Sequence, residues 1–299
     1  DNSLFLRALF RYSYPFVAFS GMVTNKNVAA SGFGFGRDCN GFTDYRHFNQ
    51  NPCNSILSLY LSAFHFFVVT LHAQNQNEFN NLKKKTMKVK KITASVNDAQ
   101  AVPQVLDNEG VSFQKIDIVN WKEYPYHPEA AFRIAHTADS ILIHYKVTEG
   151  SVRAKYGEDN GAVWTDSCME FFSIPAGDGV YYNMECSCIG TFLVGAGAER
   201  NNREHAPREV MEKVSRWSSL GRTPFEERIG ECTWEVALVI PYTVFFKHRI
   251  TSLDGQTIKA NFYKCGDELQ TPHFLSWNPI NIEKPDFHRP DFFGSLEFE

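Results

Sequence analysis

The sequence predicts an all-β fold, an antiparallel β-sandwich of the jelly-roll or immunoglobulin-like kind with short helical or loop insertions. Three observations predict it. Short segments alternate between apolar and polar residues, clusters of Gly, Pro and Asn separate these segments, and a helical period is rare. The predicted strands include residues 131–136, 141–147, 169–174, 181–188, 233–240, 258–265 and 293–298.

The first two of these segments predict a hairpin. Phe132 and Ile134 alternate with smaller or polar residues in one, Ile141 and Ile143 do so in the other, and the polar residues 137–140 separate them as a turn.

The later segments repeat this pattern. In residues 233–240 the apolar face begins at Trp234, and Pro241 ends the strand. Val210, Val214 and Trp217 lie at helical spacing and predict a short helix that packs against the core. Trp234 and Trp277 are assigned to the core because both lie next to strand-like apolar neighbours.

Residues 1–86 differ from the rest of the chain. They contain 12 of the 26 phenylalanines, many asparagines and no sustained period of 2 or 3.6. Met87 then begins Met-Lys-Val-Lys-Lys-Ile-Thr, after which the strand pattern becomes regular. We therefore expect a poorly ordered, non-native upstream extension or leader over 1–86, and a β-sandwich domain over 87–299.

Localisation depends on that boundary. If Met87 is the true start, a cytoplasmic protein is favoured. The apolar run 56–73 has the length of a signal-peptide core and is short for a membrane span, so a periplasmic or secreted protein follows if it acts as a signal sequence. No other stretch is long and apolar enough to cross a membrane.

Composition excludes some partners. A net charge of -4 and one short lysine-rich block at residues 83–91 do not form the basic face that nucleic-acid binding needs, and no membrane partner is expected. Seven cysteines without a Cys-x-x-Cys pair indicate free, buried thiols rather than disulfides or a zinc motif.

The most informative stretch runs from Trp164 to Pro175. Because strand side chains alternate, Glu170 shares a face with Phe172 and Ile174, while Met169 and Phe171 point the other way. A carboxylate is thus placed beside apolar groups, close to a tryptophan. Aromatic rings and carboxylates together are typical of a site for a polar ligand.

The order of these segments resembles carbohydrate-binding module family 9 and its DOMON-like relatives over roughly 90–299. The resemblance rests on Trp164 with residues 166–172, on Tyr182-Asn183 before residues 190–192, on 234–241, on 261–263, on 276–277 and on Phe287-His-Arg-Pro290 before Phe293-Gly294.

This resemblance implies a β-sandwich that grips the end of a sugar chain between two aromatic side chains. Trp164 matches the first clamp position and Phe287 the second, where characterised modules have tryptophan. Glu170 matches an acidic group that bonds sugar hydroxyls, Tyr263 matches another polar ligand group, and Asn183 falls where the family often has arginine. His288, beside Phe287, completes the candidate ligand-binding set.

We therefore expect a non-catalytic module that binds mono- or oligosaccharides in polysaccharide catabolism, beside separate glycoside hydrolases. No cofactor is expected, although the resemblance allows a structural calcium ion. One alternative is a glycoside hydrolase with paired carboxylates from Glu170, Glu185 or Asp166. Another is a haem-binding redox domain, with Met184 and a histidine as axial ligands.

Overall fold

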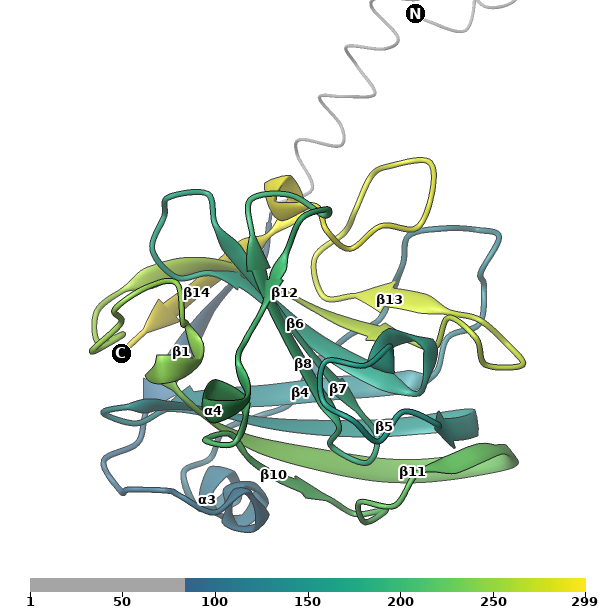
Figure 1. Cartoon of the computed structure of the whole chain (residues 1–299), viewed down its shortest axis with the longest axis horizontal. Coiled ribbons are helices and arrows are strands. Elements are labelled where there is room, and N and C mark those ends of the chain that lie inside the picture. The colour runs from purple at the N-terminus through teal and green to yellow at the C-terminus, as the bar shows by residue number, and fades with distance from the viewer. Residues whose placement is uncertain (1–83) are drawn as a thin grey trace, which may run out of the picture. The chain divides into compact units, whose positions relative to one another are not determined.

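The computed structural model describes residues 84–299. These residues form a β-sandwich of two layers, and strand β1 (Thr86–Lys91) joins one layer to the other. Its first part pairs with β14 and its last two residues pair with β4, both in parallel. Taken by hydrogen-bonded neighbours, the strand order is β10-β11-β5-β4-β1-β14-β12-β6-β7-β8-β9, and β1 stands where the first layer passes into the second (Figure 1). The predicted upstream extension and the apolar run 56–73 fall largely or wholly outside the described residues.

The first layer contains β2 (Gln114–Lys115), β4 (Glu129–His136), β5 (Ser140–Ala154), β10 (Ser215–Ser218) and β11 (Phe225–Pro241). The second contains β6 (Cys168–Ile174), β7 (Tyr181–Ser187), β8 (Phe192–Gly197), β9 (Glu204–His205), β12 (Thr257–Cys265) and β14 (Gly294–Phe298), with β3 (Ile118–Val119) and β13 (Phe274–Ser276) beside β12. Within residues 84–299, the α-helices are α3 (Val102–Asn108) and α4 (Arg208–Met211).

The main core lies between the two layers. Phe132 of β4 stacks on Phe262 of β12 with ring centroids 3.6 Å apart, and Phe171 of β6 stacks on the same ring at 4.9 Å. Trp234 and Trp277 are also buried in this core, as predicted. Burial of one such side chain contributes about 1.5–3 kcal/mol, so these aromatics are a main source of the sandwich's stability.

The all-β sandwich is confirmed, with one difference in detail. β4 and β5 form the predicted hairpin, and the sheets are mostly antiparallel. However, β1 is parallel to both of its neighbours, because a single strand bridges the two layers. The jelly-roll or immunoglobulin-like arrangement stays a prediction.

The predicted helix through Trp217 is wrong beyond its first turn. α4 ends at Met211, and Trp217 lies in β10, where it pairs with Ala237 of β11. Pairing with the edge of β11 satisfies the backbone groups of this segment, and that tertiary contact overrides a helical spacing of three apolar residues.

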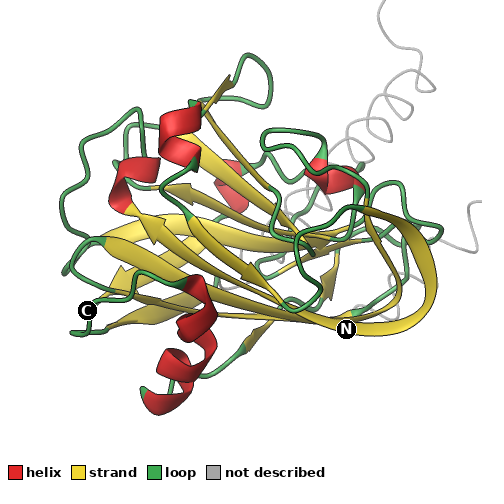
Figure 2. Ribbon diagram, turned by 60° about the horizontal axis from the view of Figure 1, so that its bottom comes forward, coloured by secondary structure: helices red, strands yellow, loops and turns green. Residues whose placement is uncertain are grey.

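Helix α3 covers the outer face of the first layer. Its residues Val102 and Leu106 are buried in one cluster with Leu142 of β5 and Val239 of β11. Figure 2 shows this helix outside the strands. Within residues 84–299, no helix has the length and apolar character needed to span a membrane.

Candidate functional site

A pocket of about 480 Å³ lies over the outer face of the second layer, on the side of β6 and β7 that faces away from the main core. The predicted alternation along β6 explains its position. Met169 and Phe171 belong to the core between the layers, while Glu170 and Phe172 line the pocket. This volume falls in the range of small-ligand sites, which is about 300–1,000 Å³.

The floor of the pocket contains two buried carboxylates. Glu170 and Glu185 are opposite each other in the β6–β7 register, and they are 2% and 4% exposed. The Oε2 atom of each is buried and has no hydrogen-bond partner among the described residues. Burial raises the pKa of both carboxyls above the ordinary range, and the nearby Glu185 raises that of Glu170 further.

Asn183 lies beside this pair and is held from both sides. Its Nδ2 donates to Glu185 Oε1 at 2.9 Å, and its Oδ1 accepts from Arg203 Nε at 2.8 Å. The guanidinium of Arg203 also lies 3.9 Å from the centroid of the Tyr181 ring. Asn183 falls where the family often has an arginine, and in the structure Arg203, from another segment, lies against its side chain.

Trp164 lies at the rim of the pocket. It is in the short 3₁₀ turn Val163–Thr165, and its side chain is 40% exposed. Its backbone carbonyl accepts a hydrogen bond from Asp267 N at 3.2 Å, which fixes the turn against the loop after β12. A large apolar ring kept open to solvent beside a polar pocket is suited to stacking on a ligand.

Phe287, another lining residue of the pocket, forms a stacked pair with Tyr263. Their ring centroids are 4.1 Å apart with an interplanar angle of 6°, and the Tyr263 hydroxyl donates to the Phe287 carbonyl at 3.2 Å. Phe287 lines the pocket but is only 9% exposed. Tyr263 is fully buried and is not a lining residue. The structure therefore places Tyr263 behind Phe287, in a supporting position.

His288 lines the pocket next to Phe287, and its Nδ1 is 2.9 Å from the Tyr181 hydroxyl. Burial, with smaller effects of the charges on Arg203 and Arg200, lowers its pKa to about 3. His288 is therefore neutral at physiological pH and able to act as a hydrogen-bonding group of the wall.

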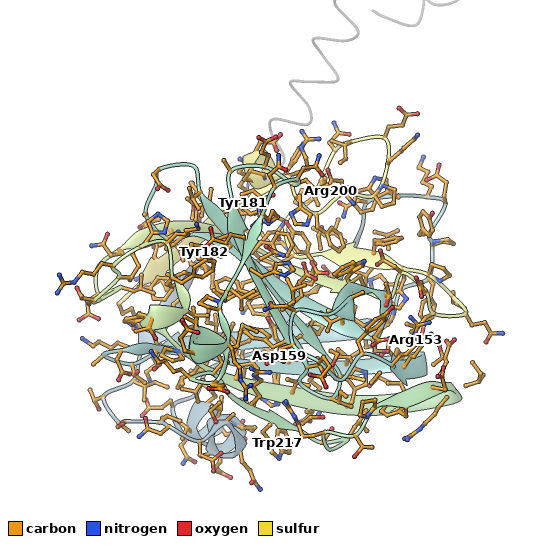
Figure 3. The ribbon with its side chains drawn as sticks, in the orientation of Figure 1. Arg153, Asp159, Tyr181, Tyr182, Arg200 and Trp217 are labelled. Carbon is orange, nitrogen blue, oxygen red and sulfur yellow. The ribbon has the colours of Figure 1, made fainter. Side chains whose placement is uncertain are left out.

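The loop between β8 and β9, together with β9 itself, supplies residues that the sequence did not single out. Arg200, Asn201, Asn202 and His205 line the pocket together with Asp286, and Arg200 Nη1 lies 3.2 Å from Asp286 Oδ1. Figure 3 shows Arg200 and Tyr181 at the same end of the molecule and Trp217 at the opposite end. The pair Asn201-Asn202 on a loop was the only sequence signal for this segment.

Two candidates of the alternative functions lie away from the pocket. Asp166 is fully buried, pairs with Arg153 Nε at 2.7 Å and accepts from the backbone of Tyr156. Its role is thus to hold the turn that precedes β6. Met184 is 1% exposed and belongs to the core between the layers, so it does not face the pocket as a haem ligand would.

Comparisons with known proteins give both a family match and similar solved structures. A family model described as carbohydrate-binding family 9 matches residues 100–298. The chain is similar to a candidate carbohydrate-binding protein from Bacteroides uniformis, with 56% identity and a TM-score of 0.71 over 73% of this chain and 100% of that chain.

More distant similarity, at 11% identity, links the chain to a carbohydrate binding module family 9 from Caldicellulosiruptor kristjanssonii. Its complex with glucose gives a TM-score of 0.45 over 72% of this chain and 96% of that chain. Its complex with cellotriose gives 0.42 over 72% and 94%. No curated protein matches the chain.

Proposed function

Because the chain belongs to carbohydrate-binding family 9, we propose that its pocket binds a free sugar or the end of a sugar chain and leaves it chemically unchanged. One observation carries the proposal. The exposed ring of Trp164 borders a pocket whose floor holds the buried, unpartnered oxygens of Glu170 and Glu185. A sugar ring offers an apolar face to the first and hydroxyls to the second.

The floor is suited to hydroxyl groups in particular. A hydroxyl both donates and accepts, and a protonated carboxyl does the same, whereas a carboxylate only accepts. Burial raises the pKa of Glu170 and Glu185, so the pair has access to both states. The amide of Asn183, held by Arg203, adds an oriented polar group beside them.

The walls are unequal, and this shapes the expected binding mode. Trp164 offers an exposed ring, while most of the Phe287 ring is covered by Tyr263 and its neighbours. We expect Trp164 to be the main stacking surface. Phe287 also lines the pocket, as do Arg200 and Asp286, whose side chains form an ion pair.

Hydrolysis is the weaker proposal for the same residues. A hydrolase needs one carboxyl that is protonated and one that is ionised, with environments that separate their pKa values. Here burial raises the pKa of both Glu170 and Glu185. We propose instead that the protein binds saccharide fragments, which separate glycoside hydrolases release during polysaccharide catabolism.

A glycan array probed with the purified chain tests the proposal. We expect selective binding of one group of saccharides, and no release of reducing sugar from those saccharides on long incubation. Binding to no saccharide on the array would contradict the proposed function. Release that is lost in Glu170→Gln would instead support the hydrolase.

A further inference from the structure

Two thiols lie directly beneath the floor of the pocket. Cys168 of β6 and Cys265 of β12 are opposite each other in the strand register, and both are buried and free. Glu170 is two residues after Cys168 and therefore points to the same face. The Cys265 thiol donates to Glu170 Oε1 at 3.0 Å. Within residues 84–299, the two Sγ atoms and a carboxylate oxygen of Glu170 all lie within 4.8 Å of one another.

This spacing suits one tetrahedral metal ion. Zn²⁺ binds Cys sulfur at about 2.3 Å and carboxylate oxygen at about 2.0–2.2 Å, so neighbouring ligand atoms are separated by roughly 3.5–3.8 Å. The three ligand atoms, all within 4.8 Å of one another, are close to that separation, and they come from two strands that pair directly. Thiolates favour Zn²⁺ over the hard cations Ca²⁺ and Mg²⁺, which take oxygen ligands.

The surrounding charges also favour a cation here. Glu185 and Asp267 line the same pocket as Glu170, and Oε2 of Glu170 is buried with no partner among the described residues. A buried carboxylate oxygen without a hydrogen-bond partner is costly, and a cation bound beside it reduces that cost.

Two positive side chains of this region, Lys264 and Arg203, already have other hydrogen-bond or ion-pair partners. The Lys264 ammonium lies 2.8 Å from Glu149 Oε2 and 2.7 Å from His273 Nε2, on the other face of β12. Arg203 donates to Asn183 and to backbone carbonyls of its own loop and the neighbouring strands. Neither group neutralises Glu170 directly.

We propose that Cys168, Cys265 and Glu170 form a binding site for a thiophilic divalent cation, with Zn²⁺ as the best fit. The fourth position is on the pocket side, where Asp267 lies two residues after Cys265. This proposal stands independently of the sugar, because its ligands are defined by the strand register. Since Glu170 serves both sites, Zn²⁺ and saccharide are expected to affect each other's affinity.

Zinc uptake by the reduced chain tests the proposal. The protein is kept under a phosphine reductant, dialysed against Zn²⁺ alone, and its metal content is measured. We expect one Zn²⁺ per chain, and affinity lower by about tenfold or more in the Cys168→Ser/Cys265→Ser variant. The matched control is Cys186→Ser/Cys188→Ser, which removes two other buried thiols that belong to the core between the layers and should keep the metal.

Co²⁺ in place of Zn²⁺ gives a readout that needs no variant. We expect the near-ultraviolet charge-transfer absorption of thiolate–Co²⁺ bonds in the wild-type chain, so the test holds even if the double variant does not fold. No metal uptake by the reduced protein, unchanged uptake in Cys168→Ser/Cys265→Ser, or Co²⁺ bound without thiolate absorption would each overturn the site. None of these results depends on whether a sugar binds.

Discussion

Glu170 and Glu185 are directly opposite each other across strands β6 and β7, and both are buried beneath the pocket. Two carboxylates so placed repel each other when both are ionised. The fold nevertheless keeps them together, because each is on a strand whose other face packs into the core between the layers. The polar floor of the pocket is thus a consequence of strand alternation.

Arg203 is predicted to support the pocket through its full set of donors. Its Nε donates to Asn183, and its two Nη atoms donate to the carbonyls of Tyr181, Gly195, Gly197 and Glu199. Lysine has three donors and lacks the planar geometry. We expect Arg203→Lys to lower the free energy of unfolding by about 1–3 kcal/mol in chemical denaturation, and to weaken saccharide binding. Arg208→Lys, at an exposed position, should change neither value; equal effects at both positions would contradict this role.

Tyr263 is predicted to support the wall rather than contact the ligand. Tyr263→Phe removes only the hydroxyl that donates to the Phe287 carbonyl and retains the stacked ring. We expect the free energy of unfolding to fall by about 0.5–1.5 kcal/mol, with little change in saccharide affinity measured by calorimetry. A folded Tyr263→Phe protein that no longer binds saccharide would show that the hydroxyl reaches the ligand after all.

His273 is predicted to make the fold sensitive to acid. Burial, and next the Lys264 ammonium, lower its pKa to about 2, so the folded chain keeps it neutral where the unfolded chain, with a pKa near 6.5, binds a proton. Its contribution to stability is therefore present above pH 6.5 and is lost progressively as the pH falls toward 2. The loss is at most about 1.4 kcal/mol per pH unit.

Denaturant unfolding between pH 7.5 and pH 4.5 measures this effect. The free energy of unfolding should fall less steeply with falling pH in His273→Gln than in the wild type, because glutamine does not titrate. His127→Gln, at an exposed position, should follow the wild-type curve. Parallel curves for the wild type and His273→Gln would rule out the histidine as the source.

Strand alternation let the sequence predict one half of the pocket. It placed Glu170 on the face opposite Phe171, and the structure has this arrangement. Alternation reports which face a side chain takes, however, and not which strands are neighbours. The parallel pairing of β1 was therefore not predictable from the pattern.

The other half depends on contacts between distant segments. Arg203 lies 20 residues after Asn183 and reaches it only because the loop after β8 folds back over β7. Phe287, between charged or polar neighbours, had the sequence context of an exposed loop residue. The stacking partner that buries it, Tyr263, comes from another strand. Local composition carries no signal for such pairs.

Titration calorimetry of Trp164→Ala with the best saccharide from the array tests the central claim most directly. The matched control is Phe113→Ala, because Phe113 is 36% exposed, close to the 40% of Trp164, and does not line the pocket. We predict that Trp164→Ala loses about 2 kcal/mol or more of binding free energy, while Phe113→Ala binds like the wild type. Unchanged affinity in a folded Trp164→Ala protein would contradict the account, because the sugar would then bind elsewhere.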